Sequence, residues 1–89
     1  MRARVFVTLK PSVFDPQGRT IVDALHSLGY ASVDDVRQGK YFELDLKVAS
    51  AQDAERVAAE VSQRVLSNPV IESFRLEIVE PERAGGASR

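Results

Sequence analysis

Hydrophobic and polar residues alternate along three stretches of the chain, which is the pattern of a half-buried β-strand. A weaker stretch over Val33 to Val36 predicts a shorter additional strand, which would meet the following strand in a turn at Gln38-Gly39. The apolar positions of the three clear stretches are Val5, Val7 and Leu9, then Phe42, Leu44, Leu46 and Val48, and finally Phe74, Leu76 and Ile78.

Two further stretches repeat apolar residues every three or four positions, the spacing of an amphipathic helix. Asp15-Pro16 predicts the start of the first helix, with a side-chain cap and a proline tolerated at the first helical position; Thr20 is a competing, later start. Gly29 ends this helix. Ser50 begins the second, and Asn68-Pro69 ends it. The apolar faces are Ile21, Ala24, Leu25 and Leu28 in the first helix, and Ala54, Val57, Ala58, Val61 and Val65 in the second.

The resulting order is β-α-β-β-α-β, which predicts an α+β fold. With right-handed crossovers it becomes a two-layer ferredoxin-like sandwich, an antiparallel sheet with both helices on one face. Residues 1–80 would form the single domain, and residues 81–89 a flexible tail. The other sheet face is expected to be either solvated or in contact with a partner. Its residues are Phe6, Thr8, Tyr41, Glu43, Asp45, Arg75, Glu77 and Val79.

Composition narrows the functional classes. The formal net charge is −1, from 12 basic and 13 acidic residues, so we expect neither a nucleic-acid partner nor a membrane partner. No apolar run reaches membrane-spanning length and no signal core is present, so a cytoplasmic protein is expected. There are no cysteines, hence no disulfide and no thiolate chemistry. A core this small often gains stability from oligomerisation.

The chain offers little catalytic chemistry. The one histidine, His26, lies off the apolar helical face without a local ligand partner, so it is interpreted as a surface residue. Asp34-Asp35 has the spacing of a turn rather than of two carboxylates that converge in a pocket. No phosphate-binding or nucleophile motif is present. We therefore expect no catalytic residue and no metal site.

Two binding modules share the predicted fold. An RNA-recognition motif is disfavoured because the strands lack its basic-aromatic signature. A small-molecule-binding regulatory domain of ACT type stays open, although the segment from Lys10 to Phe14 lacks the glycine-rich loop expected there. The loop from Lys10 to Arg19 is either a plain strand-to-helix connection or a docking loop.

Four segments, in this order and spacing, resemble the PurS family, the small subunit of phosphoribosylformylglycinamidine synthase in purine biosynthesis. The resemblance covers about Val5 to Glu80, nearly the whole domain. The segments are Val7-Thr8-Leu9-Lys10, Asp15-Pro16-Gln17-Gly18, Asp35-Val36-Arg37-Gln38-Gly39-Lys40-Tyr41-Phe42-Glu43-Leu44 and Asn68-Pro69-Val70-Ile71-Glu72-Ser73-Phe74.

The resemblance implies a non-catalytic subunit of a glutamine- and ATP-dependent ligase. It would form a homodimer or tetramer and bridge a glutaminase subunit (PurQ-like) and a synthetase subunit (PurL-like), supporting ammonia transfer. No cofactor would bind this chain, since ATP and Mg belong to the large partner subunit. The expected subunit-interface residues are Lys10, Asp15, Pro16, Gly18, Arg37, Gly39 and Lys40, together with Phe6 and Tyr41 on the outer sheet face.

Overall fold

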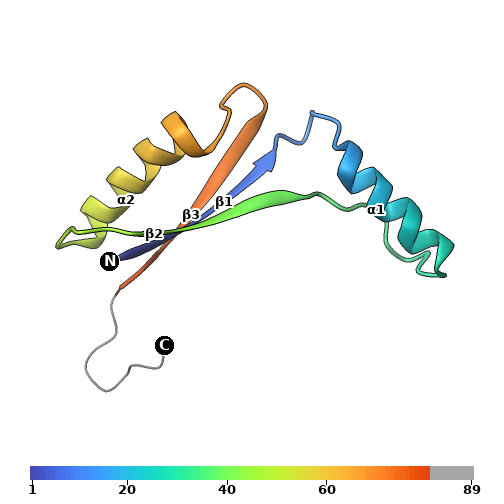
Figure 1. Ribbon diagram of the computed structural model, residues 1–89, viewed down its shortest axis with the longest axis horizontal. Coiled ribbons are helices and arrows are strands. Elements are labelled where there is room, and N and C mark those ends of the chain that lie inside the picture. The colour runs from blue at the N-terminus through green and yellow to red at the C-terminus, as the bar shows by residue number, and fades with distance from the viewer. Residues whose placement is uncertain (81–89) are drawn as a thin grey trace, which may run out of the picture.

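The computed structural model describes residues 1–80, which form one antiparallel sheet and two α-helices (Figure 1). The α+β class is confirmed. The predicted tail over 81–89 lies outside the described residues. In chain order the elements are β1 (Arg2–Leu9), α1 (Pro16–Ser27), β2 (Gly39–Asp45), α2 (Ala51–Val61), the short π-helical turn η1 (Ser62–Leu66) and β3 (Glu72–Val79).

The sheet has the order β2-β1-β3, and both neighbours run antiparallel to β1. Val5 on β1 lies opposite Phe42 and Leu76, whereas Phe6 lies opposite Tyr41 and Arg75. Because alternate residues point to opposite faces of a strand, this register separates an apolar helix face from a mixed open face. The predicted division of residues between the two faces is confirmed.

Helix α2 packs on the helix face, principally against β1 and β3. Ser50 caps it, since its hydroxyl accepts a hydrogen bond of 3.1 Å from the Asp53 N–H. Ala54 and Ala58 are fully buried, and their small side chains let the helix approach the sheet closely. With Val5 on β1, also fully buried, they form the centre of the core.

The end of α2 departs from the predicted apolar face. The chain continues into η1, whose wider turn shifts the later side chains around the axis relative to an α-helix. Val65, predicted to face the core, is 75% exposed, so that assignment is wrong. The predicted end at Asn68-Pro69 is confirmed, because η1 stops at Leu66.

Helix α1 begins and ends as predicted at Asp15-Pro16 and at Gly29, whose φ of 99° is in the left-handed region that favours glycine. The later start at Thr20 is wrong, because Thr20 lies inside the helix and its hydroxyl donates to the Pro16 carbonyl. Helix α1 extends beyond the end of the sheet, and the segment 30–38 runs back along it (Figure 1). Val22 is buried, with 1% exposure.

One strand of the predicted β-α-β-β-α-β order does not form. Between residues 30 and 38 the described chain contains no strand, and no hairpin turns at Gln38-Gly39. The reason is a competing hydrogen bond: the Gln38 N–H donates to the Asp15 carboxylate instead of to a neighbouring strand.

The structure is elongated, with extents of 48 × 35 × 14 Å along its principal axes. Its radius of gyration is 17.0 Å, against about 12 Å for a compact chain of this length.

Candidate subunit-contact sites

Seven of the nine predicted interface residues gather where β1 leads into α1 and the chain returns into β2. We call this region the junction, comprising Lys10, Asp15, Pro16, Gly18, Arg37, Gly39 and Lys40. An open groove of about 350 Å³ lies there. The groove is lined by Val7, Thr8, Leu9, Asp15, Pro16, Gln17, Gln38, Gly39, Lys40 and Glu72.

Asp15 is the centre of the junction and is only 6% exposed. Its Oδ1 accepts a hydrogen bond of 2.9 Å from the Gly18 N–H, and its Oδ2 accepts one of 2.8 Å from the Gln38 N–H. These bonds stabilise the carboxylate, so they hold the pKa of Asp15 below its ordinary value, the Gln38 bond contributing most. One side chain thus caps α1 and ties the returning chain to it.

Arg37 holds the other side of the junction. Its Nη2 lies 2.9 Å from the Lys10 carbonyl oxygen, 3.0 Å from that of Val13 and 3.5 Å from that of Leu9. The guanidinium therefore binds the backbone that connects β1 to α1. Arg37 therefore positions the loop between β1 and α1 within its own chain. Its guanidinium binds backbone carbonyl oxygens rather than being held free for a partner.

Gly18 and Gly39 are required by close backbone approach. A side chain at Gly18 would collide with the Val36 carbonyl oxygen. One at Gly39 would collide with the Val7 carbonyl oxygen and come within 2.8 Å of the Thr8 methyl group. Gly18 therefore lets the return segment lie against α1. Gly39 lets β2 begin close against β1.

Lys40 and Lys10 are the cations of the junction besides Arg37. Lys40 Nζ lies 3.6 Å from Glu72 on β3, and its side chain is 54% exposed. The Lys10 N–H donates to the Ile71 carbonyl oxygen, and its side chain is half-buried. Pro16 is exposed at the start of α1. Of these two lysines, Lys40 is thus the more exposed.

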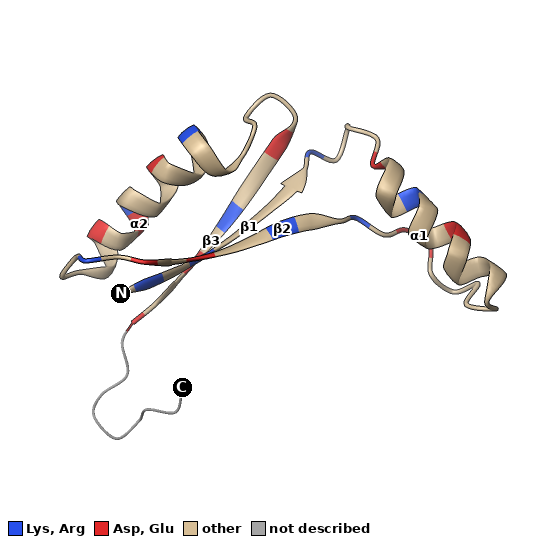
Figure 2. Cartoon of the chain, viewed as in Figure 1, with Lys and Arg blue, Asp and Glu red and all other residues tan. Residues whose placement is uncertain are grey.

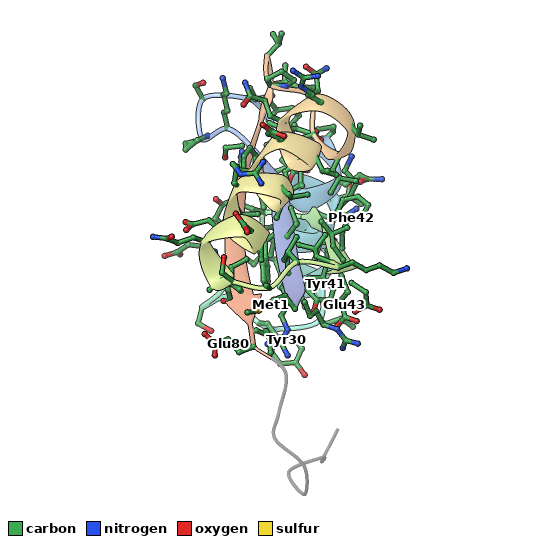
Figure 3. The ribbon with its side chains drawn as sticks, turned by 90° about the vertical axis from the view of Figure 1, so that its left-hand side faces the viewer. Met1, Tyr30, Tyr41, Phe42, Glu43 and Glu80 are labelled. Atoms are coloured by element: carbon green, nitrogen blue, oxygen red, sulfur yellow. The ribbon has the colours of Figure 1, made fainter. Side chains whose placement is uncertain are left out.

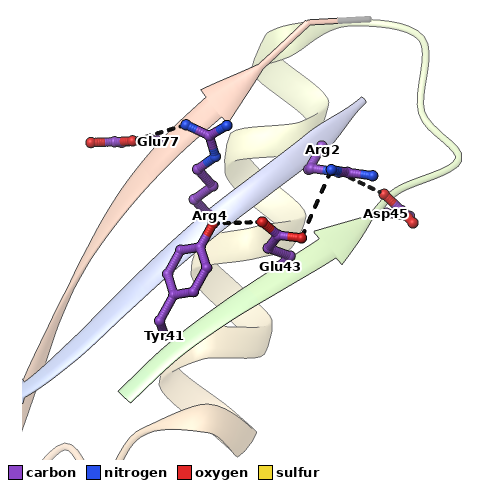
Figure 4. Close-up of polar contacts among 6 residues, drawn as sticks. All are labelled: Arg2, Arg4, Tyr41, Glu43, Asp45 and Glu77. Atoms are coloured by element: carbon purple, nitrogen blue, oxygen red, sulfur yellow. Dashed lines mark hydrogen bonds and ion pairs between the residues drawn. The ribbon is translucent and has the colours of Figure 1, made fainter. Parts of the chain in front are cut away.

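Phe6 and Tyr41 lie apart from the junction, on the open face. Their ring centroids are 5.1 Å apart, and the Arg75 guanidinium lies 4.1 Å from the centroid of Phe6. The Tyr41 hydroxyl donates to Glu43 at 2.7 Å (Figure 4). This hydrogen bond raises the pKa of the Tyr41 phenol above its ordinary value. The rings form an aromatic centre whose Tyr41 is 51% exposed.

Charged side chains surround these rings in opposite-sign pairs. Arg2 Nε lies 3.1 Å from Asp45, and Arg75 Nη1 lies 2.8 Å from Glu77. Longer pairs link Arg2 to Glu43 at 3.8 Å and Arg4 to Glu77 at 3.9 Å (Figure 4). Each exposed pair contributes little to stability. Acidic and basic residues are likewise interspersed over the described elements (Figure 2).

The remaining candidates have structural positions. His26 Nε2 lies 2.7 Å from the Val33 carbonyl oxygen and so helps to fasten the segment 30–38 to α1. Within residues 1–80 no group of three or more metal-ligating side chains converges, and no helix is long and apolar enough to cross a membrane. Sequence reasoning missed the Gln17–Gln38 side-chain hydrogen bond of 2.6 Å, which carries no local sequence signal.

Comparison with known proteins gives the family. The family model PurS, phosphoribosylformylglycinamidine (FGAM) synthase, matches residues 2–80. The phosphoribosylformylglycinamidine synthase subunit PurS of Bacillus subtilis is 44% identical over 79 residues, which cover 89% of this chain and 93% of that protein. The chain belongs to the PurS family. The resemblance seen in the sequence is confirmed.

Solved PurS structures share the fold. A B. subtilis PurS structure aligns with a TM-score of 0.77 at 44% identity, covering 89% of this chain and 98% of that one. PurS of Methanocaldococcus jannaschii, one of the subunits of formylglycinamide ribonucleotide amidotransferase in the purine biosynthetic pathway, aligns with a TM-score of 0.83 at 30% identity, covering 91% and 98%. In a structure of PurLQS from Thermotoga maritima the matching chain gives a TM-score of 0.79 at 25% identity, covering 85% and 93%.

PurS membership makes the chain a subunit of phosphoribosylformylglycinamidine synthase, in purine biosynthesis. The alternative of an ACT-type regulatory domain is not favoured. Within this chain, Asp15 and Arg37 bind backbone groups of both connections of α1 and so fix the direction of the helix.

Proposed function

We propose that this chain is the non-catalytic assembly subunit of the synthase. It bridges a glutaminase subunit and an ATP-dependent synthetase subunit and supports the transfer of ammonia between them. ATP and Mg belong to the synthetase subunit, and this chain binds no cofactor of its own. The assembly is cytoplasmic, and the chain acts in it as a homodimer or tetramer.

The observation that supports this proposal is that one small chain carries two separate candidate surfaces, the junction and the open face. A bridge needs two such surfaces. The junction presents Lys40, Pro16 and the open groove. The open face presents Phe6 and Tyr41 within balanced charges, the aromatic centre and polar rim typical of protein interfaces.

The proposal is tested by reconstitution. Glutaminase and synthetase subunits are mixed with and without this chain, and turnover is measured with glutamine and, separately, with ammonium as the nitrogen donor. We expect the chain to raise glutamine-dependent turnover much more than ammonium-dependent turnover, since only the former needs ammonia to pass between subunits. Unchanged glutamine-dependent turnover at all subunit concentrations would contradict the proposal.

Lys40→Ala tests the junction as a docking surface more cleanly than a change at Arg37, which also holds the fold. We expect a several-fold rise in the chain concentration needed for half-maximal turnover, with an unchanged melting temperature. Lys47→Ala, which removes the same charge just beyond the opposite end of β2, is the matched control and should leave that concentration unchanged. Equal effects of the two variants would remove the junction from the interface.

A further inference from the structure

Strand β3 forms a long free edge of the sheet within residues 1–80. The strand order β2-β1-β3 places it at one side, and its 8 residues pair with β1 along their whole length without a bulge. Glu80, directly after the strand, lies at the same end of the sheet as Met1 (Figure 3). Natural edge strands are usually short, bulged, or protected by lysine or proline. Glu72–Val79 has none of these features.

The backbone groups along this edge alternate in direction. The Lys10 N–H donates to the Ile71 carbonyl oxygen at 2.8 Å, and the β1–β3 register continues to this pair, so the two residues lie directly opposite each other. Hydrogen-bonded and non-hydrogen-bonded pairs alternate along an antiparallel ladder. Arg75 and Glu77 therefore turn their N–H and C=O groups toward β1, and the residues that alternate with them turn theirs away from the sheet. These outward-facing residues are Phe74, Leu76 and Ile78.

The side chains of β3 also alternate, between the two faces of the sheet. Phe74, Leu76 and Ile78 lie on the helix face and remain half-buried, although α2 packs on this strand. Arg75 and Glu77 lie on the open face, paired at 2.8 Å, with side chains 65% and 45% exposed. The edge thus combines unpaired backbone groups, an incompletely covered apolar row and an exposed ion pair.

We propose that the β3 edges of two copies pair antiparallel about a two-fold axis at Leu76, so that one sheet continues from chain to chain. The occupant is a second copy because the edge is complementary to itself in this register. Arg75 of each copy lies opposite Glu77 of the other, and on the helix face Phe74 lies opposite Ile78. About six backbone hydrogen bonds join the two strands, and the opposite charges and apolar pairs across them add to the stability.

Other registers lose this complementarity. A two-fold axis at Arg75 would place two arginines directly opposite each other, and one at Glu77 would place two glutamates so. Like charges in directly opposite positions are destabilising. An axis between two residues would set helix-face residues opposite open-face residues. An axis nearer either end of β3 would shorten the pairing, so the sequence of the strand selects Leu76.

This inference rests on the homo-oligomer proposed above and specifies one contact in it. The contact uses only the edge of β3, so the junction and the rings of Phe6 and Tyr41 stay available to other subunits. The low formal net charge of −1 allows two copies to approach without strong mutual repulsion.

The absence of cysteine from the chain permits a direct test of the register. A full chain carrying Arg75→Cys is mixed with a tagged full chain carrying Glu77→Cys, oxidised, and analysed by non-reducing electrophoresis and peptide mapping. We expect a disulfide between the two chains, because opposite residues of a non-hydrogen-bonded pair have Cα atoms about 4.5 Å apart, within the range of a disulfide. Ser73→Cys mixed with Glu77→Cys is the matched control, since these positions are opposite only for an axis at Arg75. A preference for the control pair, or no link between chains in either mixture, would overturn the proposal.

Charge reversal tests the contact without cross-linking. Arg75→Glu places two carboxylates opposite each other at two symmetric points, so we expect the dissociation constant of self-association, measured by analytical ultracentrifugation, to rise on the order of 10-fold. Arg75→Glu combined with Glu77→Arg restores opposite charges across the edge and should return this constant to within about 3-fold of wild type. A double variant as weak as the single one, or a monomeric wild type at micromolar concentration, would contradict the pairing.

Amide hydrogen exchange separates a second copy from a different occupant. We expect the outward N–H groups of Phe74, Leu76 and Ile78 to be protected at high chain concentration and to exchange faster on dilution. Protection that arises only when a glutaminase or synthetase subunit is added would assign the edge to a strand of that subunit and overturn the proposal. Glutamine-dependent turnover separately decides the bridging role.

Discussion

The two helices of this PurS chain differ in what covers their apolar sides, although their sequences follow the same pattern. Each begins with a side-chain cap and carries an apolar stripe. Helix α2 lies on the sheet of its own chain, with Ala54 and Ala58 fully buried. Helix α1 extends beyond the sheet, with Leu28 73% exposed. The difference shows that an amphipathic pattern encodes an apolar side of a helix, but not whether the chain's own sheet covers that side.

The largest expected effect comes from comparing two alanines, one from the predicted apolar face of each helix. Ala58→Asp puts a carboxylate without a partner between α2 and the sheet, which costs more than about 3 kcal/mol and should prevent stable folding. Ala24→Asp, on the exposed side of α1, should leave the monomer folded. Circular dichroism and urea denaturation measure both. A folded Ala58→Asp protein, or an unfolded Ala24→Asp protein, would break the comparison.

The molecule has two halves: the sheet with α2, called the sheet half, and α1 with its two connections, called the α1 half. A smaller effect is expected at Gly39, where the two halves meet. Gly39→Ala brings a methyl group against the Val7 carbonyl oxygen, so β2 must shift away from β1. We expect the free energy of unfolding to fall by about 1–3 kcal/mol in urea denaturation. Gly29→Ala at the end of α1 meets no atom within 4 Å and has only the strain of its φ of 99°, about 1 kcal/mol. If Gly29→Ala lowered the free energy of unfolding more than Gly39→Ala does, the position least tolerant of an added methyl group would lie in the α1 half.

Arg37→Ala should loosen α1 while leaving the sheet intact. It removes the hydrogen bonds to three backbone carbonyl oxygens at a cost of about 1–2 kcal/mol. Because the α1 half can open locally, amide hydrogen exchange should accelerate in α1 about 10-fold or more and stay unchanged in β1. Arg19→Ala removes only an exposed pair with Asp23 at 3.3 Å and is the control. Uniform acceleration throughout the chain would mean that the two halves unfold together.

Local features of the sequence predicted the elements well, and their arrangement less completely. Caps such as Asp15 and Ser50 and the alternation in the strands act over a few residues, so each can be recognised alone. The missing strand over 33–36 could not be foreseen, because it depends on Gln38 donating to a carboxylate 23 residues earlier. Arg37 was predicted as an interface cation, but the distant carbonyl groups that it binds have no sequence pattern.

The smallest expected effect is a pH dependence of stability that arises at Asp15, in the α1 half. The hydrogen bonds from Gln38 and Gly18 lower the pKa of Asp15 in the folded chain. The stabilisation is therefore fully present above the unfolded pKa of about 4 and is lost as pH falls through the lower folded pKa. Asp15→Asn retains one oxygen for Gly18 but cannot also accept from Gln38 through an oxygen, and it does not titrate. We expect wild type to melt about 3–6 °C higher than Asp15→Asn at pH 6.

That difference should shrink toward zero as the pH falls below about 4 and through the lower pKa of folded Asp15, because protonated Asp15 then resembles the amide. Melting curves followed by circular dichroism across this range measure it. Asp23→Asn is the matched control, since this carboxylate pairs only with the exposed Arg19 in the described structure, and it should show little difference at any pH. A gap between wild type and Asp15→Asn that stays constant with pH would mean that the lost hydrogen bond, and not the charge of Asp15, stabilises the junction.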